Sequence, residues 1–125
     1  MNEAEAMEFC KAWLPAWTGN QPDRLIEFYA DHALYLDPAK PQGLKGRERI
    51  LAYFSKLLAS NPDWEWEAVE IFPTKRGFVG KWKATIPVGS KTLVEHGLDI
   101  VEIQDGRIVR NEVYFNVANL LAAMG

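Results

Sequence analysis

The sequence contains few of the residues on which covalent cross-links and metal sites depend. Cys10 is the only cysteine, and His32 and His96 are the only histidines among 125 residues. One cysteine cannot form an intramolecular disulfide, which fits a reducing compartment. Two histidines without carboxylates at ligand spacing do not indicate a metal site. We therefore expect neither a metal nor another cofactor, and a core that is stable without them.

Long apolar runs and an excess of positive charge are also missing. No run approaches the ~20 apolar residues of a membrane helix. The acidic first residues are not followed by the basic and apolar segments of a signal peptide. The formal net charge is −3, whereas a general nucleic-acid binder needs a basic face. We expect a cytoplasmic protein that binds neither membranes nor nucleic acid.

The common signatures of nucleophilic and phosphate chemistry are absent as well. Gly43-Leu44-Lys45-Gly46 lacks the Gly-Lys-Ser/Thr ending of a phosphate-binding loop. The serines, which include Ser55, Ser60 and Ser90, have no nucleophile-elbow context. What remains for chemistry is a carboxylate that exchanges protons.

Helical periodicity dominates the first half of the chain, strand patterns follow, and residues 117–124 favour a short helix or a loose tail. Met7, Cys10, Leu14 and Trp17 form the apolar stripe of a first helix, which Pro15 should kink or end. A short second helix follows, with Asn20 as a possible cap, and residues 47–60 form a third. We expect a short strand over 33–37, a loop over 38–46, and strands over 64–73, 78–86, 92–104 and 107–115. Asp105-Gly106 indicates a tight hairpin turn.

This order of elements predicts a single α+β domain over residues 1–125. Runs of helices followed by runs of strands favour helices packed on one face of a sheet. We expect three N-terminal helices on a curved, mostly antiparallel sheet that forms a cone. With five Trp, four Tyr and six Phe in the chain, the mouth of such a cone is a natural aromatic pocket.

Asp37 is the first candidate for a functional carboxylate. Strand alternation places Tyr35 and Asp37 on one face of the short strand and Leu34 and Leu36 on the other. Asp37 then points either into the cavity or into solvent. Because Asp and Pro both favour turns, Asp37-Pro38 also has the simpler interpretation of a turn start.

Asp99 is the second candidate, in the middle of an apolar strand. Asp is disfavoured in strand interiors, and a carboxylate that faces a core must be paired or protonated. Gly97, on the same face, would open space for a ligand, whereas His96 points to the opposite face. The alternative is a solvent-facing Asp on a half-exposed strand.

Several segments together resemble a known superfamily. They are Phe28-Tyr29-Ala30-Asp31-His32-Ala33-Leu34-Tyr35-Leu36-Asp37-Pro38, the loop and helix start at residues 43–50, Gly97-Leu98-Asp99-Ile100-Val101, residues 105–109 and Tyr114-Phe115-Asn116. In this order they resemble the nuclear transport factor 2-like superfamily, which includes ketosteroid isomerase and the SnoaL-like cyclases. The resemblance implies the cone-shaped fold, which hosts many activities.

Within that superfamily the layout is most similar to ketosteroid isomerase. The resemblance implies that Asp37 is a general base and that Asp99, kept protonated, donates to an oxyanion; the neutral carboxylic acid of that enzyme is itself a standard example. Trp13 stands where the family has an oxyanion-hole tyrosine, and Phe54 where it has a supporting one, beside Tyr53. Val113 stands where SnoaL-like cyclases often carry a polar residue, with Asn111 two positions earlier.

Two functional hypotheses follow from these observations. The first is a cofactor-free enzyme for a small, apolar, carbonyl-bearing molecule, which isomerises, cyclises or dehydrates it with Asp37 and Asp99. The second is a non-catalytic protein of the same fold that binds a ligand or forms a dimer. We expect a homodimer through an outer sheet face that includes Trp64 or Trp66, Ile71 and Tyr114. The expected pocket wall consists of Trp13, Tyr35, Phe54, Phe78, Trp82, Val101, Asn111, Val113 and Phe115.

Overall fold

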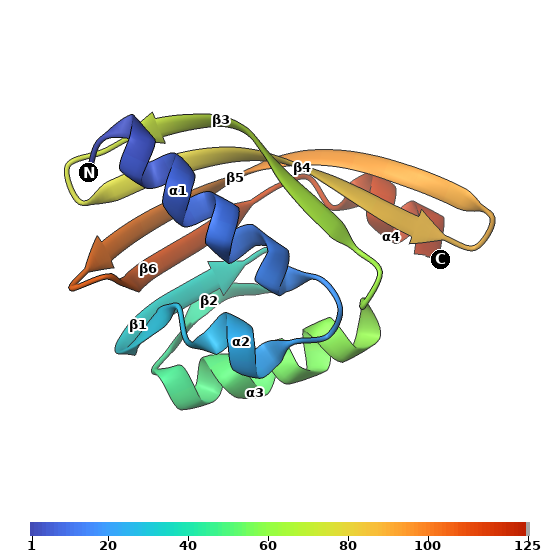
Figure 1. Cartoon of the computed structure of the whole chain (residues 1–125). Helices are drawn as coiled ribbons and strands as arrows, with labels where there is room; N and C mark the ends of the chain where they lie inside the picture. Colours follow the sequence, from blue (N-terminus) through green and yellow to red (C-terminus); the bar gives the residue numbers. More distant parts are fainter. Residues whose placement is uncertain (125) are drawn as a thin grey trace.

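A computed structural model describes residues 1–124 and places helices against the concave face of one six-stranded sheet (Figure 1). The strand order is β2-β1-β6-β5-β4-β3, and every neighbouring pair is antiparallel except β1 and β6. The elements are α1 (Glu3–Trp13), the 3-10 helix η1 (Leu14–Trp17), α2 (Pro22–Ile26), β1 (Tyr29–Asp37), β2 (Lys40–Lys45), α3 (Arg47–Ser60), β3 (Glu65–Pro73), β4 (Gly77–Val88), β5 (Lys91–Gln104), β6 (Arg107–Tyr114) and α4 (Ala118–Met124).

The helices differ from the expected set of three at the N-terminus. Within the described residues there are four α-helices, and only α1 and α3 are long. α1 begins with a reciprocal cap between Asn2 and Glu5. It ends at Trp13, because Pro15 continues the chain as a 3-10 turn. α2 has no side-chain cap: Asn20 adopts a positive φ of 54° and the helix begins at Pro22.

The largest difference from the expected strands lies between residues 29 and 45. β1 begins at Tyr29, before the expected start at residue 33, and the expected loop contains strand β2. β2 is an edge strand that pairs only with β1. Pro41 is tolerated there because an edge strand leaves one row of backbone groups unpaired. The other strands agree with the expected ranges to within two residues, and Asp105 and Gly106 form the expected turn with φ of 53° and 79°.

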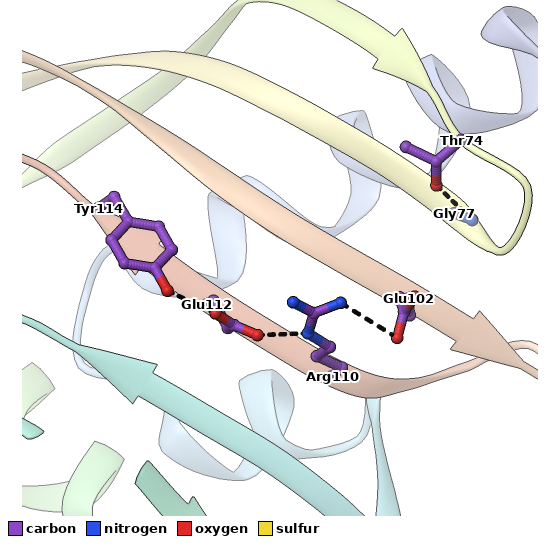
Figure 2. A network of polar contacts seen from close by, with 6 residues as sticks. All are labelled: Thr74, Gly77, Glu102, Arg110, Glu112 and Tyr114. Atoms are coloured by element: carbon purple, nitrogen blue, oxygen red, sulfur yellow. Dashed lines mark hydrogen bonds and ion pairs between the residues drawn. The ribbon is translucent and has the colours of Figure 1, made fainter. Parts of the chain in front are cut away.

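The two faces of the sheet carry different side chains. The inner face and the helices bury an aromatic core, whereas the outer face of β6 carries a polar network (Figure 2). There Arg110 forms ion pairs with Glu102 and Glu112, and the Tyr114 hydroxyl donates to Glu112. Strand alternation then requires that Asn111 and Val113, the residues between them, point inward.

The described part of the chain has no helix long and apolar enough to cross a membrane.

Candidate functional site

The concave side of the sheet contains a cavity of about 330 Å³, between β1, β6, the start of β3, the middle of β4 and β5, and the helices η1, α3 and α4. This volume lies at the lower end of the range for small-molecule sites. Most lining residues are aromatic or aliphatic, and the two lining carboxyl groups are those of Asp37 and Asp99. The wall consists of Leu14, Trp17, Tyr35, Asp37, Pro38, Ala39, Tyr53, Leu57, Leu58, Asn61, Trp64, Trp66, Trp82, Asp99, Val113, Phe115, Val117, Leu120 and Leu121.

Strand register brings the two acids to the same part of the cavity. Asp99 of β5 is the cross-strand partner of Val113 on β6. On the other side of β6, Leu36 pairs with Glu112, so Asp37 lies beside Val113 as well. The two carboxyl-bearing strands therefore flank β6, with backbones roughly 10 Å apart, which is twice the spacing of neighbouring strands.

Asp37 is buried and accepts four hydrogen bonds. Its Oδ2 accepts from the hydroxyls of Tyr35 at 2.8 Å and Tyr53 at 2.7 Å. Its Oδ1 accepts from the backbone N–H groups of Ala39 and Lys40, both at 2.9 Å. Both interpretations of Asp37 therefore apply: Oδ1 accepts from the turn that follows the strand, and Oδ2 accepts from the tyrosines of the cavity wall. Four donors fill the acceptor sites of a carboxylate and hold it in a fixed orientation.

The tyrosines that contact Asp37 remain hydroxyl donors. Burial and the neighbouring Asp37 carboxylate raise the pKa of Tyr35 well above its usual value. Burial and the hydrogen bond to Asp37 raise the pKa of Tyr53. Neither phenol therefore ionises near neutral pH, and Tyr53, which is half-buried on the cavity wall, is positioned to offer its O–H to a ligand.

Asp99 has a drier environment with fewer partners. Its Oδ1 accepts from the Asn111 side-chain amide at 2.9 Å, and Tyr29 donates to the other end of that amide at 2.8 Å. Tyr29 thereby fixes the orientation in which Asn111 presents its NH₂ group to Asp99. Burial raises the pKa of Asp99 to about 7, although the donors Asn111 and Trp82 lower it. Asp99 is therefore poised to gain or lose a proton near neutral pH.

This raised pKa predicts a pH dependence of stability. Asp99 binds its proton more tightly in the folded chain than in the unfolded chain, where its pKa is near 3.8. Its contribution is complete below that value and is lost as the pH rises toward 7. We expect the free energy of unfolding to fall over this window by up to roughly 4 kcal/mol, which is the free energy that corresponds to a pKa shift from 3.8 to about 7. The difference between urea unfolding curves of the wild type and Asp99→Asn measures it, and equal slopes against pH would contradict it.

Gly97 makes room for a tryptophan and not for a ligand, contrary to our expectation. A Cβ at Gly97 would lie 2.3 and 2.5 Å from ring carbons of Trp82 and 2.9 Å from Cβ of Phe115. The Trp82 indole therefore rests directly on the Gly97 backbone. It forms the cavity wall beside Asp99 and packs edge-on against Trp66 at 5.0 Å and Phe115 at 5.5 Å.

We expect Gly97→Ala to displace Trp82 and to lower stability by about 1–3 kcal/mol, as overpacking does. Urea denaturation followed by tryptophan fluorescence measures both effects. Gly80→Ala is the matched control on the neighbouring strand, because a Cβ there meets its nearest side-chain atoms at 3.4 and 3.6 Å. A Gly97→Ala protein as stable as this control would show that the Trp82 ring can move without cost.

Six of the residues expected at the site line the cavity together: Tyr35, Asp37, Trp82, Asp99, Val113 and Phe115. The other five, Trp13, Phe54, Phe78, Val101 and Asn111, are fully or almost fully buried and are not part of its wall. Trp13 borders a separate void of about 10 Å³, and its indole nitrogen has no partner. It is therefore not placed to donate to a ligand in the main cavity.

Sequence reasoning missed thirteen of the nineteen residues of the wall. Tyr53 was noted only as a neighbour of Phe54, yet Phe54 is in the core and Tyr53 contacts Asp37. Adjacent helix positions differ by 100° in direction, so one turn of α3 contributes Phe54 to the core and Tyr53 to the cavity wall. Trp17, Trp64 and Trp66 also face the cavity, as do residues of the C-terminal segment. No local pattern identifies these residues, since their place depends on how η1, β3 and α4 pack.

Metal ligation has no support in the described residues. No group of three or more His, Cys, Asp and Glu side chains within residues 1–124 could hold a metal ion. Cys10, which is buried, has a pKa that burial raises to about 12, followed by a smaller effect of Asp99. It remains a neutral thiol.

Comparison with known sequences assigns the fold to a family. Residues 10–111, which include both acids, match the sequence profile of the SnoaL-like domain. The chain belongs to the SnoaL-like family. This SnoaL-like domain is also 31% identical over 96 residues to phenazine biosynthesis protein PhzA1 of Pseudomonas aeruginosa. The match covers 71% of the chain and 59% of PhzA1, so the chain spans about three fifths of the curated relatives that it matches.

Solved structures confirm the predicted superfamily fold for this SnoaL-like domain. A protein with a ketosteroid isomerase-like fold from Catenulispora acidiphila superimposes with a TM-score of 0.81 at 20% identity, over 94% of this chain and 92% of that one. A putative SnoaL-like polyketide cyclase from a Jannaschia species has a TM-score of 0.80 at 14% identity, over 98% and 92% of the chains. At these identities the likeness establishes the fold, and function rests on the site.

Proposed function

We propose that this SnoaL-like domain is a cofactor-independent enzyme that moves a proton next to a carbonyl group of a small apolar molecule. One observation carries the proposal: two buried carboxyl groups face one apolar cavity in unlike environments. Asp37 accepts from four hydrogen-bond donors, whereas burial raises the pKa of Asp99 to about 7. Pairs of acids whose environments differ in this way typically divide acid and base roles.

The geometry favours Asp99, and not Asp37, as the residue that takes the proton. A base needs an unoccupied lone pair and a pKa near the working pH. Asp99 has two donors, the Asn111 amide to its Oδ1 and the Trp82 indole, so part of its acceptor capacity stays open. Every acceptor site of Asp37 is filled. We assign Asp37 instead to holding Tyr35 and Tyr53 as polar anchors, which revises the base role that the resemblance implied.

In the proposed step, the ionised Asp99 carboxylate removes a proton from the carbon next to the carbonyl. The C–H electron pair forms a C=C bond, and the carbonyl π pair moves to oxygen. Tyr53 turns its O–H from Asp37 to this oxygen, while Asp37 keeps Tyr35 and two backbone donors. Asp99 then returns the proton to the same carbon or to a conjugated one. Isomerisation, cyclisation and dehydration all share this enolate step.

The comparisons support a small-molecule role in outline. The sequence relative is named for phenazine biosynthesis, and one structural neighbour is called a putative polyketide cyclase. Both names refer to the formation of ring compounds. The aromatic wall of the cavity suits a flat apolar ring of this kind.

The test uses a ketone whose exchange needs only this step. The protein is incubated with 2-tetralone in D₂O near neutral pH, and the loss of the α-proton signals is followed by NMR. We expect exchange at least tenfold above an equal concentration of heat-denatured protein. Binding of the ketone without accelerated exchange would refute catalysis and leave the alternative, a small-ligand-binding protein.

We propose further that two copies pair through the outer face of the sheet. Leu98 and Tyr114 are cross-strand partners on that face, exposed at 41% and 49%, and Val94 lies on the same face of β5. The expected surface needs correction, since Trp64 and Trp66 line the cavity and Ile71 is in the core. Light scattering should give twice the chain mass, and Leu98→Glu should halve that mass.

The buried, free Cys10 fits a cytoplasmic location.

A further inference from the structure

The charge of the cavity wall has one sign. Of its nineteen lining residues, the only ones that carry charge near neutral pH are Asp37 and Asp99, and none is Lys, Arg or His. The hydroxyls of Tyr35 and Tyr53 donate to Asp37, so an anionic group could gain such a donor only by taking it from that carboxylate. An anionic ligand group would therefore meet no cation among the lining residues and would lose its hydration, which is costly in a buried site. The Lys40 ammonium outside the wall lies over the Tyr53 ring, 5.5 Å from its centroid. The wall thus disfavours carboxylate, sulfonate and phosphate groups.

The same wall has an arrangement of aromatic rings that attracts cations. Trp66 meets Trp82 edge-on with ring centroids 5.0 Å apart, and lies 6.0 Å from Trp64 and 6.4 Å from Trp17. Trp82 in turn meets Phe115 edge-on at 5.5 Å. All five of these rings line the cavity. Ring faces, of Trp above all, bind ammonium groups from which water has been removed.

Asp99 is the acid that can pair with a cation in this space. The four donors of Asp37 already balance much of its charge. Asp99 has fewer donors, the Asn111 amide and the Trp82 indole, and lies beside Phe115 in the wall. The titratable groups that act on Asp99 are Cys10 of α1 and Tyr29 of β1, and both stay neutral near pH 7 because their pKa values are raised.

We infer that the cavity selects an apolar ligand that carries a cationic nitrogen, with the ammonium group against the tryptophan rings of the wall and near Asp99, and that it rejects anions. This inference deepens the proposed function, because it names a charge that the substrate carries beside its carbonyl group. It depends on the same cavity but on a different property of it, the sign of its charge. Binding alone tests it, without any turnover.

Three probes of similar size separate charge from shape. Phenyltrimethylammonium and tert-butylbenzene have the same shape and differ by one positive charge, and benzenesulfonate carries a permanent negative charge. None of the three titrates between pH 5 and 9. Binding is followed by the fluorescence of the tryptophans in the wall and repeated by calorimetry. At pH 8 we expect the ammonium probe to bind roughly tenfold more tightly than tert-butylbenzene, and the sulfonate not to bind.

The pH profile and one variant identify Asp99 as the counter-ion. Ammonium affinity should rise as the pH increases through 7, because ionised Asp99 attracts the cation, while tert-butylbenzene should show the opposite, weaker trend. Asp99→Asn should remove the pH dependence and most of the tenfold preference. Asp105→Asn is the matched control, because Asp105 is exposed in the β5–β6 turn and its positive φ suits Asn.

The outcomes separate this inference from the proposed function. Equal affinity for the ammonium probe and tert-butylbenzene at pH 8, or tight binding of the sulfonate, overturns the inference and leaves the ketone exchange test untouched. A cation preference that survives in Asp99→Asn overturns the role of Asp99. If none of the probes binds, the cavity is not a ligand site, and the inference and the proposed function both fail.

Discussion

Asp99→Asn is expected to reduce the exchange of 2-tetralone protons by about 10³-fold, within the range that general acid–base groups contribute. Asparagine has nearly the same shape, and its carbonyl oxygen still accepts from Asn111, so the cavity wall is preserved. What the substitution removes is the carboxyl group whose pKa burial raises to about 7. The rate of exchange should also lose its dependence on pH around that value.

Controls separate this effect from damage to the fold. The unfolding transition of Asp99→Asn should remain cooperative, and the protein should still bind tert-butylbenzene. Tyr53→Phe should reduce exchange less, because it removes a donor to the substrate oxygen and leaves the base in place. Unchanged exchange in Asp99→Asn, together with its loss in Asp37→Asn, would return the base role to Asp37.

Asp37→Asn is expected to destabilise the chain by roughly 2–5 kcal/mol, the cost of leaving buried donors without acceptors. Each Asp37 oxygen accepts from two donors: two tyrosine hydroxyls on one side and two backbone N–H groups on the other. The NH₂ group of asparagine replaces one of the two carboxylate oxygens. In either orientation it then faces two hydrogen-bond donors and cannot accept from them. The free energy of unfolding in urea measures the effect.

Single tyrosine variants test the origin of that cost. Tyr35→Phe and Tyr53→Phe each remove one donor and leave the carboxylate with three, so each should cost only about 1 kcal/mol, the net worth of one hydrogen bond. If Asp37→Asn lies within that same range, the amide has found an arrangement that satisfies both sides. The four hydrogen bonds would then not explain the position of Asp37.

Much of the architecture could be predicted from the sequence. The helix over Arg47–Ser60 and the four-stranded meander follow from apolar periodicity, which depends only on the spacing of neighbouring residues. Alternation along β5 placed Asp99 and His96 on opposite faces, and Asp99 is buried while His96 is exposed. The missing features were informative too, since the lack of histidine and cysteine clusters directed attention to the two acids.

β2 and the cavity wall could not be predicted in this way. Residues Lys40–Lys45 have a loop composition and form a strand only because the edge of β1 is available to pair with them. The sequence predicted open space next to Gly97, but Trp82 of the neighbouring strand fills this space. Tyr53 and Phe54 are equally plausible wall residues until α3 is docked on the sheet.

The sequence by itself determined which residues repeat with helical or strand spacing, which two carboxylates are the candidates for chemistry, and to which superfamily the chain belongs. Only the tertiary structure decided what each carboxylate contacts. Tyr53 is 16 residues from Asp37, and Tyr29 is 82 residues from the Asn111 that it orients. The protonation of an acid depends on its burial and its donors, and both come from chain segments that meet only when the protein folds.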